Sequence, residues 1–153
     1  MRKLLTYTLL LGLIITSCKK KKDENGPLPP VSETPEITEV RVSKTTINQF
    51  DDLVFYIDYI DGDGNLGTED ADVKSIFIVD NRDNSIVHEF HLYPLLPVDE
   101  VASIQGTLNV NLENVILLDQ SNNSETASFS IYIKDRSNKK SNTINSGAVT
   151  IIK

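Results

Sequence analysis

Apolar and polar residues alternate with a period of two along most of the chain beyond residue 35. The pattern is clearest in DLVFYIDYI, residues 52–60, where Leu53, Phe55, Ile57 and Tyr59 fall on one face. A period of two is typical of β-strands, and the residues concerned are rich in the β-branched and aromatic types that strands favour. Helical spacing is hard to find, so the pattern predicts an all-β domain.

Seven segments carry this alternation and are separated by turn-rich stretches such as DNRDNS and DRSNKKSN. They are EITEVRVS (36–43), DLVFYIDYI (52–60), VKSIFIVD (73–80), SIVHEFHL (85–92), ASIQGTLNVNL (102–112), ETASFSIYIKD (125–135) and NTINSGAVTIIK (142–153). In the first, strict alternation places Ile37 with Glu39 and Arg41, opposite Val40 and Val42. About seven short antiparallel strands at this spacing predict a β-sandwich. The segment 113–120, ENVILLDQ, is either a short helical turn or the end of a strand.

The last two segments predict a closing hairpin, in which Asp135 begins the turn and Ser141 and Asn142 begin the final strand. This hairpin resembles the last one of bacterial immunoglobulin-like, cadherin-like and fibronectin-type domains, where an Asp and a Ser-Asn pair flank the turn. The resemblance covers about 25 residues. It implies an immunoglobulin-like sandwich rather than a barrel.

The N-terminus has the pattern of a secretory signal, residues 1–17, with a basic start and an apolar run from Leu4 to Ile15. This run is shorter than the roughly 20 residues that a membrane-spanning helix needs. The sequence ITSC, ending in Cys18, resembles the lipobox of bacterial lipoproteins. The resemblance implies cleavage before Cys18 and attachment of lipid to its thiol, with acyl chains as the membrane anchor. In the alternative interpretation, Cys18 is only an apolar residue at the end of an ordinary signal.

Residues 18–35 follow as a linker with four lysines after Cys18 and prolines at 27, 29, 30 and 35. Prolines favour an extended, semi-rigid chain, so this linker predicts a spacer between the lipid and the domain of residues 36–153. Lys19 stands where the lipoprotein resemblance would require Asp for retention at an inner membrane, which favours the outer membrane or the cell surface. Removal of the signal takes the formal charge from −7 to −9, which argues against binding nucleic acid.

The whole layout resembles small lipoproteins of the phylum Bacteroidota. The shared features are the acylated cysteine, the Pro-rich linker and the motif DGDGNLG, residues 61–67, followed by PLLP and IQGTLNVNL. The resemblance spans most of the chain. It implies a cellular address and a fold, but no reaction.

Eight carboxylates and no Lys or Arg lie between Asp51 and Asp72. Such a cluster is costly unless water or a cation screens it. The stretch DGDGNLGTED resembles the later part of an EF-hand or dockerin loop, with Leu66 as the inward apolar residue. The resemblance implies calcium as the ion, with Asp61 and Asp63 as ligands and Asp70 closing the loop. In an alternative register, Asp61, Asp63 and Asn65 alternate as the first three ligands, but Leu66 then occupies the place where an EF-hand needs glycine. In the alternative interpretation, the Asp-Gly pairs form only a tight acidic turn after a strand.

The chain offers little for catalysis, because it has two histidines, one cysteine and no motif typical of a nucleophile elbow or a phosphate-binding loop. We therefore expect a non-catalytic binding or structural module, anchored in the envelope by lipid. The alternatives are a calcium-stabilised domain that binds glycans or proteins, and an accessory subunit of an envelope complex. The expected partners are the membrane, through the lipid, and an envelope protein or glycan.

Overall fold

A computed structural model describes residues 32–153. The expected signal, Cys18 and nearly all of the linker lie outside these residues. The described part is all-β and contains no helix. It therefore holds no helix that is long and apolar enough to cross a membrane. The segment 113–120 is neither helical turn nor strand but an irregular loop, which nonetheless buries Val115 and Leu117.

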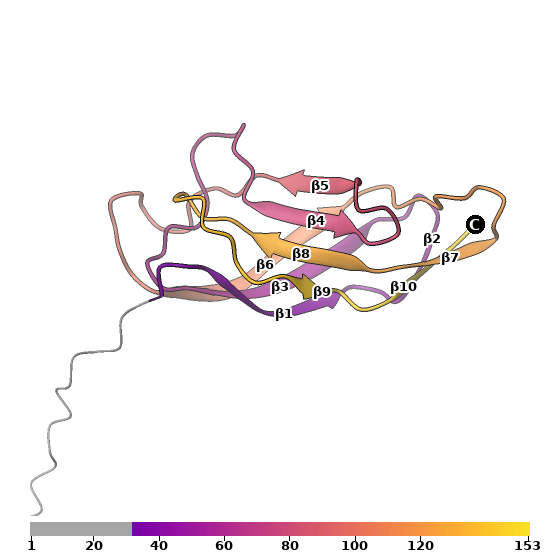
Figure 1. The fold of residues 1–153 in the computed structure, drawn as a ribbon, viewed down its shortest axis with the longest axis horizontal. Helices are drawn as coiled ribbons and strands as arrows, with labels where there is room; N and C mark the ends of the chain where they lie inside the picture. The colour runs from indigo at the N-terminus through magenta and orange to yellow at the C-terminus, as the bar shows by residue number, and fades with distance from the viewer. Residues whose placement is uncertain (1–31) are drawn as a thin grey trace, which may run out of the picture.

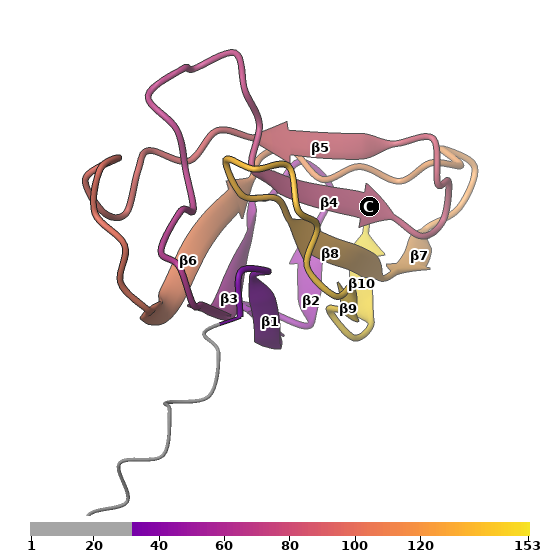
Figure 2. The same ribbon diagram turned by 60° about the vertical axis from the view of Figure 1, so that its left-hand side comes forward.

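Ten strands make up the fold (Figure 1). They are β1 (Glu36–Val42), β2 (Thr46–Asn48), β3 (Leu53–Asp61), β4 (Ile76–Asp80), β5 (Val87–Phe90), β6 (Ile104–Leu112), β7 (Ser124–Ala127), β8 (Phe129–Ile133), β9 (Ile144–Asn145) and β10 (Val149–Ile152). Two layers of sheet face each other (Figure 2): β1-β3-β6 forms one, and β5-β4-β8-β9 forms the other. A small third sheet, β2-β10-β7, lies at one end. The predicted immunoglobulin-like β-sandwich is confirmed.

Each of the seven predicted segments contains a strand, while the structure has ten strands in all and one parallel pairing. The last two segments are each divided, at Ser128 and around Gly147, so that one half of each joins the β2-β10-β7 sheet. The short strand β2 was not predicted, because three residues carry too little alternation to be recognised. Its pairing with β10 is parallel, whereas the other six pairings are antiparallel.

The core lies between the two layers and contains the predicted inward face of β3. Phe55 of β3 meets Phe129 of β8 edge to face, with 5.2 Å between ring centroids, which joins the two sheets at the centre of the core. In β1 the predicted faces are wrong. An irregularity between Ile37 and Glu39 shifts the register, so Ile37 is fully buried while Val40 and Val42 pack against the same core.

The predicted closing hairpin is formed by β8 and β9, and the Ser-Asn pair fixes it to the rest of the fold. Ser141 Oγ accepts a hydrogen bond from Ile133 N (3.0 Å). The side chain of Asn142 makes two bonds with the backbone of Ile37, because Oδ1 accepts from its N–H and Nδ2 donates to its carbonyl, each at 2.8 Å. Asn142 thus joins the first strand to the last hairpin.

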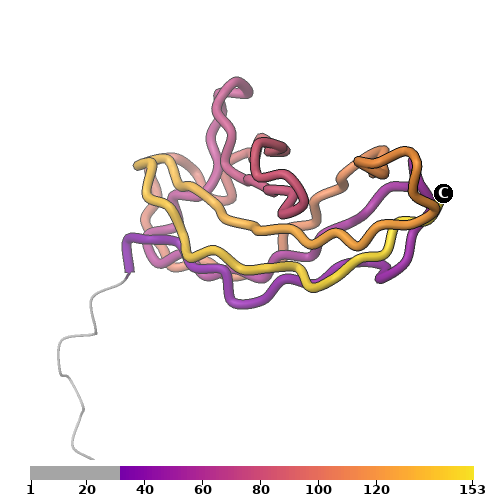
Figure 3. The backbone as a smooth tube through the Cα atoms, turned by 45° about the vertical axis from the view of Figure 1, so that its right-hand side comes forward, coloured from indigo at the N-terminus to yellow at the C-terminus, as the bar shows by residue number. Residues whose placement is uncertain are grey.

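The sandwich has two distinct ends. Glu36 pairs with Ile60, so the linker enters where β3 finishes. We call this the linker end; the loops after β3, after β5 and after β8 also lie there (Figure 3). The opposite, distal end holds the turn before β3, the loop 113–123 and the C-terminus. Nine residues of β3 separate the two ends, which amounts to about 30 Å.

Candidate functional site

The motif DGDGNLG forms the start of the β3–β4 loop, at the linker end. Leu66 is fully buried in the core, as the comparison with calcium loops predicted. Gly64 and Gly67 have φ values of 70° and 80°, a region that residues with a Cβ avoid. The motif therefore consists of one inward apolar anchor between two left-handed glycines, which turn the chain tightly after Asp61.

The two glycines also let the β3–β4 loop lie directly against residues 92–102, which contain the Pro-flanked YPLLPV. A Cβ on Gly64 would collide with the carbonyl oxygen of Ala102, and one on Gly67 with the carbonyl of Tyr93. Hydrogen bonds from Leu95 N to Leu66 O (3.2 Å) and from Thr68 N to Leu92 O (2.8 Å) fix the contact. Residues 92–102 thus cover this end of the sandwich.

Asp61 is the most unusual carboxylate of the fold, because none of its surface is exposed. Its Oδ2 accepts a hydrogen bond from Leu66 N (3.1 Å), whereas its Oδ1 is buried and has no donor. Asp63 beside it accepts a bond from Asn65 Nδ2 (2.9 Å) through Oδ2, and its Oδ1 likewise has none. Asn65 Oδ1 is the third buried oxygen without a donor.

A fourth such oxygen comes from Asp135, in the β8–β9 loop. Asp135 is only 6% exposed; its Oδ1 accepts a bond from Lys139 N (2.7 Å), and its Oδ2 has no donor. The two loops are in direct contact, since Arg136 N donates to Asn65 O (3.2 Å) and Asn65 Nδ2 to Ser137 Oγ (3.3 Å). Two loops far apart in sequence therefore bring together three carboxylates and one amide. We call Asp61, Asp63, Asn65 and Asp135 the oxygen cluster.

The pKa of Asp61 is raised to about 6, above all by burial, then by the charge of Asp63 and a hydrogen bond with its carboxyl group, and last by the charge of Asp135; the N–H of Leu66 acts in the opposite direction. Two cationic side chains of the β8–β9 loop make their hydrogen bonds outside the cluster. Lys139 Nζ pairs with Glu33 of the linker at 2.6 Å, and Arg136 Nη1 donates to the Gly67 carbonyl at 3.4 Å. The charges of Asp135 and Asp63 raise the pKa of Lys139, but within residues 32–153 no Lys or Arg side chain forms an ion pair with a carboxylate of the cluster.

The raised pKa of Asp61 predicts a pH-dependent stability when divalent cations are removed. The folded state keeps this proton to about pH 6, whereas the unfolded chain loses it near its ordinary value of 3.8, so stability falls as pH rises between these values. Asp61→Asn should therefore be more stable than the wild type by about 3 kcal/mol at about pH 8, and nearly equally stable at about pH 4. Urea unfolding in chelator measures this difference. A difference that does not change with pH would contradict the assignment.

Of the four ligands predicted from the sequence, Asp61, Asp63 and Asn65 belong to the oxygen cluster, but Asp70 does not. Asp70 is exposed, and its Oδ1 accepts a bond from Asp72 N (3.0 Å) within a local turn. Asp135 is not among the ligands predicted from the sequence. The sequence analysis places it only at the start of the turn in the closing hairpin. Among residues 32–153, no three acidic, His or Cys side chains are already gathered as they would be around a bound ion.

Several other carboxylates of the acidic stretch have hydrogen-bond partners of their own. Asp58, on the outer face of β3, accepts bonds from Arg41 Nη2 (2.8 Å) and Thr107 Oγ1 (2.6 Å). Asp51 caps the turn after β2 by accepting a bond from Asn48 N (2.9 Å). The crowding expected from the sequence is thus dispersed over several faces, while the buried Asp61 and the half-buried Asp63 remain close together.

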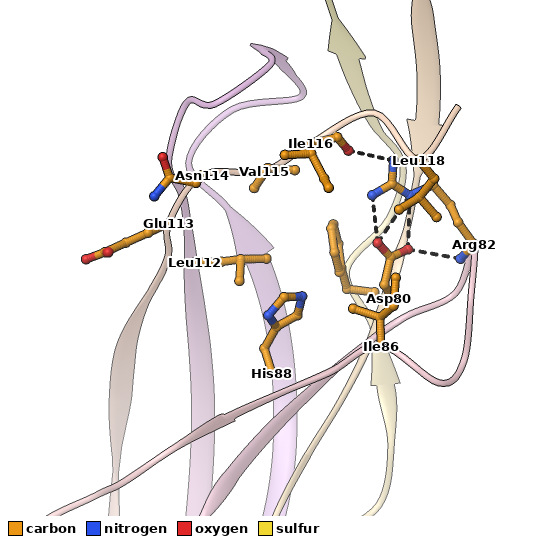
Figure 4. Close-up of a pocket in the computed structure, with 11 residues that line it drawn as sticks. Asp80, Arg82, Ile86, His88, Leu112, Glu113, Asn114, Val115, Ile116 and Leu118 are labelled. Atoms are coloured by element: carbon orange, nitrogen blue, oxygen red, sulfur yellow. Dashed lines mark hydrogen bonds and ion pairs between the residues drawn. The ribbon is translucent and has the colours of Figure 1, made fainter. Parts of the chain in front are cut away.

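A second feature is a small apolar cavity of about 140 Å³ between β4, β5 and the loop 113–118 (Figure 4). Its apolar lining comes from Ile86, Leu112, Val115, Ile116, Leu118 and Phe129. Arg82 closes one side, where Nη2 binds Asp80 Oδ2 (2.7 Å) and Nη1 binds Glu125 Oε2 (2.8 Å) and Ile116 O (3.0 Å). Every charged group of this network has a partner, which indicates a structural role.

Comparison of the chain with protein-family models, with curated proteins and with solved structures gave no match. What the protein does is therefore inferred from its own residues.

Proposed function

We propose that the chain is a lipid-anchored protein of a bacterial cell envelope, held at the outer membrane or cell surface, whose β-sandwich acts as a non-catalytic binding or structural module. The observation that carries the proposal is the sequence ITSC, directly after an apolar run that is too short to span a membrane. Cys18 is the only cysteine of the chain, so its thiol has no intramolecular disulfide partner. The layout is of the kind found in small Bacteroidota lipoproteins.

The orientation of the domain supports this role. The linker enters at the linker end, so a chain anchored by Cys18 would present its distal end away from the lipid. Phe50, at the turn before β3, is 63% exposed and has a φ of 72°. An exposed aromatic held in a rarely populated backbone conformation is typical of a contact residue. Ile116, Leu118 and Ile152 are exposed apolar residues of the same end.

The anchor is tested by labelling cells with a fatty-acid analogue and separating membrane from soluble fractions. The wild type should carry the label and remain with the membrane, and Cys18→Ser should lose both properties, because a hydroxyl does not replace the thiol as the site of lipid attachment. Ser17→Ala is the matched control, since Ala is also accepted before the cysteine of a lipobox, and it should label like the wild type. Labelling of Cys18→Ser would end the proposal.

Two classes of partner are separated by a glycan array and by pull-down from detergent-solubilised envelope. We favour a protein partner, because the distal end presents apolar side chains and the chain contains no Trp for stacking on sugars. The pull-down should recover a defined protein with the wild type and lose it with Phe50→Asn, which tolerates the same backbone conformation. Val101→Asn, at a still more exposed apolar residue of the linker end, should retain it. Binding to a glycan on the array, without recovery of a protein, would instead identify the domain as a glycan-binding module.

A further inference from the structure

The oxygen cluster leaves four buried acceptors without a donor within residues 32–153. Buried polar atoms are almost always paired, and a carboxylate oxygen buried without a donor is costly. Here the cost is repeated, because Asp61 and Asp135 are both more than nine-tenths buried and each keeps one oxygen unpaired. Such a concentration in one place indicates a missing positive ligand rather than four separate defects.

The surrounding loops are fixed in a way that holds these oxygens together. The β3–β4 loop is anchored by Leu66 in the core and by its close approach to residues 92–102. The β8–β9 loop is closed by Asp135 itself, whose backbone N–H donates to Lys139 O (3.1 Å) and whose carbonyl accepts from Asn138 N (3.0 Å). The acceptors therefore belong to two well-tied loops and not to freely moving side chains.

We propose that Asp61, Asp63 and Asn65 of the β3–β4 loop and Asp135 of the β8–β9 loop bind one calcium ion between them. Calcium takes six to eight oxygen ligands from carboxylates, amides and backbone carbonyls in flexible geometry, and the cluster offers only oxygen donors. Zinc is disfavoured because none of the four residues supplies nitrogen or sulfur. Magnesium demands near-ideal octahedral geometry, which side chains from two separate loops meet less readily.

The ion also completes the arrangement that the sequence suggested only in part. The three carboxylates are not yet gathered as around a bound ion, so the ion would draw them together by small shifts of the side chains while the two loops keep their present contacts. Asp135 supplies the ligand for which Asp70 is wrongly placed. The site lies beside the Lys139–Glu33 pair, so that calcium would stiffen the end of the sandwich at which the linker enters.

Thermal unfolding of the full-length protein, purified from membranes in detergent and followed by circular dichroism, tests the site. An affinity typical of extracellular calcium modules, about 10⁻⁴ to 10⁻³ M, predicts a rise in Tm of roughly 5 to 10 °C in about 10 mM calcium over chelator. Magnesium at the same concentration should give less than half this rise. No shift with calcium, or an equal shift with both ions, would overturn the assignment.

Three variants locate the ion. Asp61→Asn and Asp135→Asn keep the side-chain shape and remove a charge, and each should abolish the calcium-dependent rise. Asp70→Asn is the matched control from the same acidic stretch, and it should keep the full rise. If Asp135→Asn fails to give the β-sheet spectrum in chelator, Asp63→Asn, at a half-buried position, replaces it in the test. A full rise in the cluster variants, or its loss in Asp70→Asn, would contradict the proposed ligands.

Discussion

Replacing Arg82 by Met should lower the free energy of unfolding at neutral pH by about 3 to 5 kcal/mol, the range found when one partner of a buried ion pair is removed. The guanidinium binds the carboxylates of Asp80 and Glu125 at once, and its side chain is only 13% exposed. Met keeps much of the apolar stem but leaves both carboxylates without their counter-charge. The loss therefore measures uncompensated charge rather than lost packing. Urea unfolding at neutral pH gives the value.

Two comparisons make this prediction specific. Arg41 also bridges two carboxylates, those of Glu39 and Asp58, but half of its side chain is exposed, so Arg41→Met should cost less than about 1 kcal/mol. The cost of Arg82→Met should also shrink at low pH, because protonation removes the charges that the variant leaves unpaired. A penalty that is equal for the two arginines, or independent of pH, would show that the buried network contributes no more than a surface pair.

Gly67→Ala should be the most damaging substitution of a single small residue in the β3–β4 loop. Left-handed backbone at a non-glycine residue costs about 1 to 2 kcal/mol. The new methyl group would in addition collide with the carbonyl of Tyr93 and approach Leu92 O at 2.9 Å. Because both obstacles are backbone, the loops must separate, and overpacking of this kind adds about 1 to 3 kcal/mol. We expect a total loss of roughly 3 kcal/mol by urea unfolding.

Gly147 provides a matched control within the same chain. Its φ of 76° is nearly that of Gly67, but a Cβ there would have nothing within 4 Å. Gly147→Ala therefore pays only for backbone strain, about 1 to 2 kcal/mol. The difference between the two variants isolates the close contact between the β3–β4 loop and residues 92–102. Equal losses would mean that this contact is looser than the structure indicates.

The period-two pattern predicted the core residues of β3, because the two faces of a regular strand depend only on the order of neighbouring residues in the sequence. Leu53, Phe55 and Ile57 alternate with polar or half-buried neighbours, and all three are fully buried. The pattern failed where one residue changes the phase. In β1, the irregularity after Ile37 reverses the faces of every later residue, which strict alternation does not allow for.

The candidate site could be predicted only within one loop. Asp61, Asp63 and Asn65 follow one another at intervals of two residues, and this local spacing was sufficient to predict them as ligands. Asp135 joins them through sheet pairing between strands far apart in sequence, which one sequence without structure does not reveal. Asp70 was selected from the spacing of a loop between two helices. Here the loop follows a strand, and after Gly67 it runs past residues 92–102 into a separate turn.

The two bonds between Asn142 and Ile37 have a mechanical consequence for a domain held at one end. A force between the linker and a partner at the distal end would act along β1, across hydrogen bonds that lie perpendicular to it. Such bonds are loaded in shear and resist together, instead of opening one after another. Asn142 adds two more bonds at the point where the force enters, and it transfers part of the load to the last hairpin. β1 would therefore be the strand whose hydrogen bonds resist the unfolding of the domain under force.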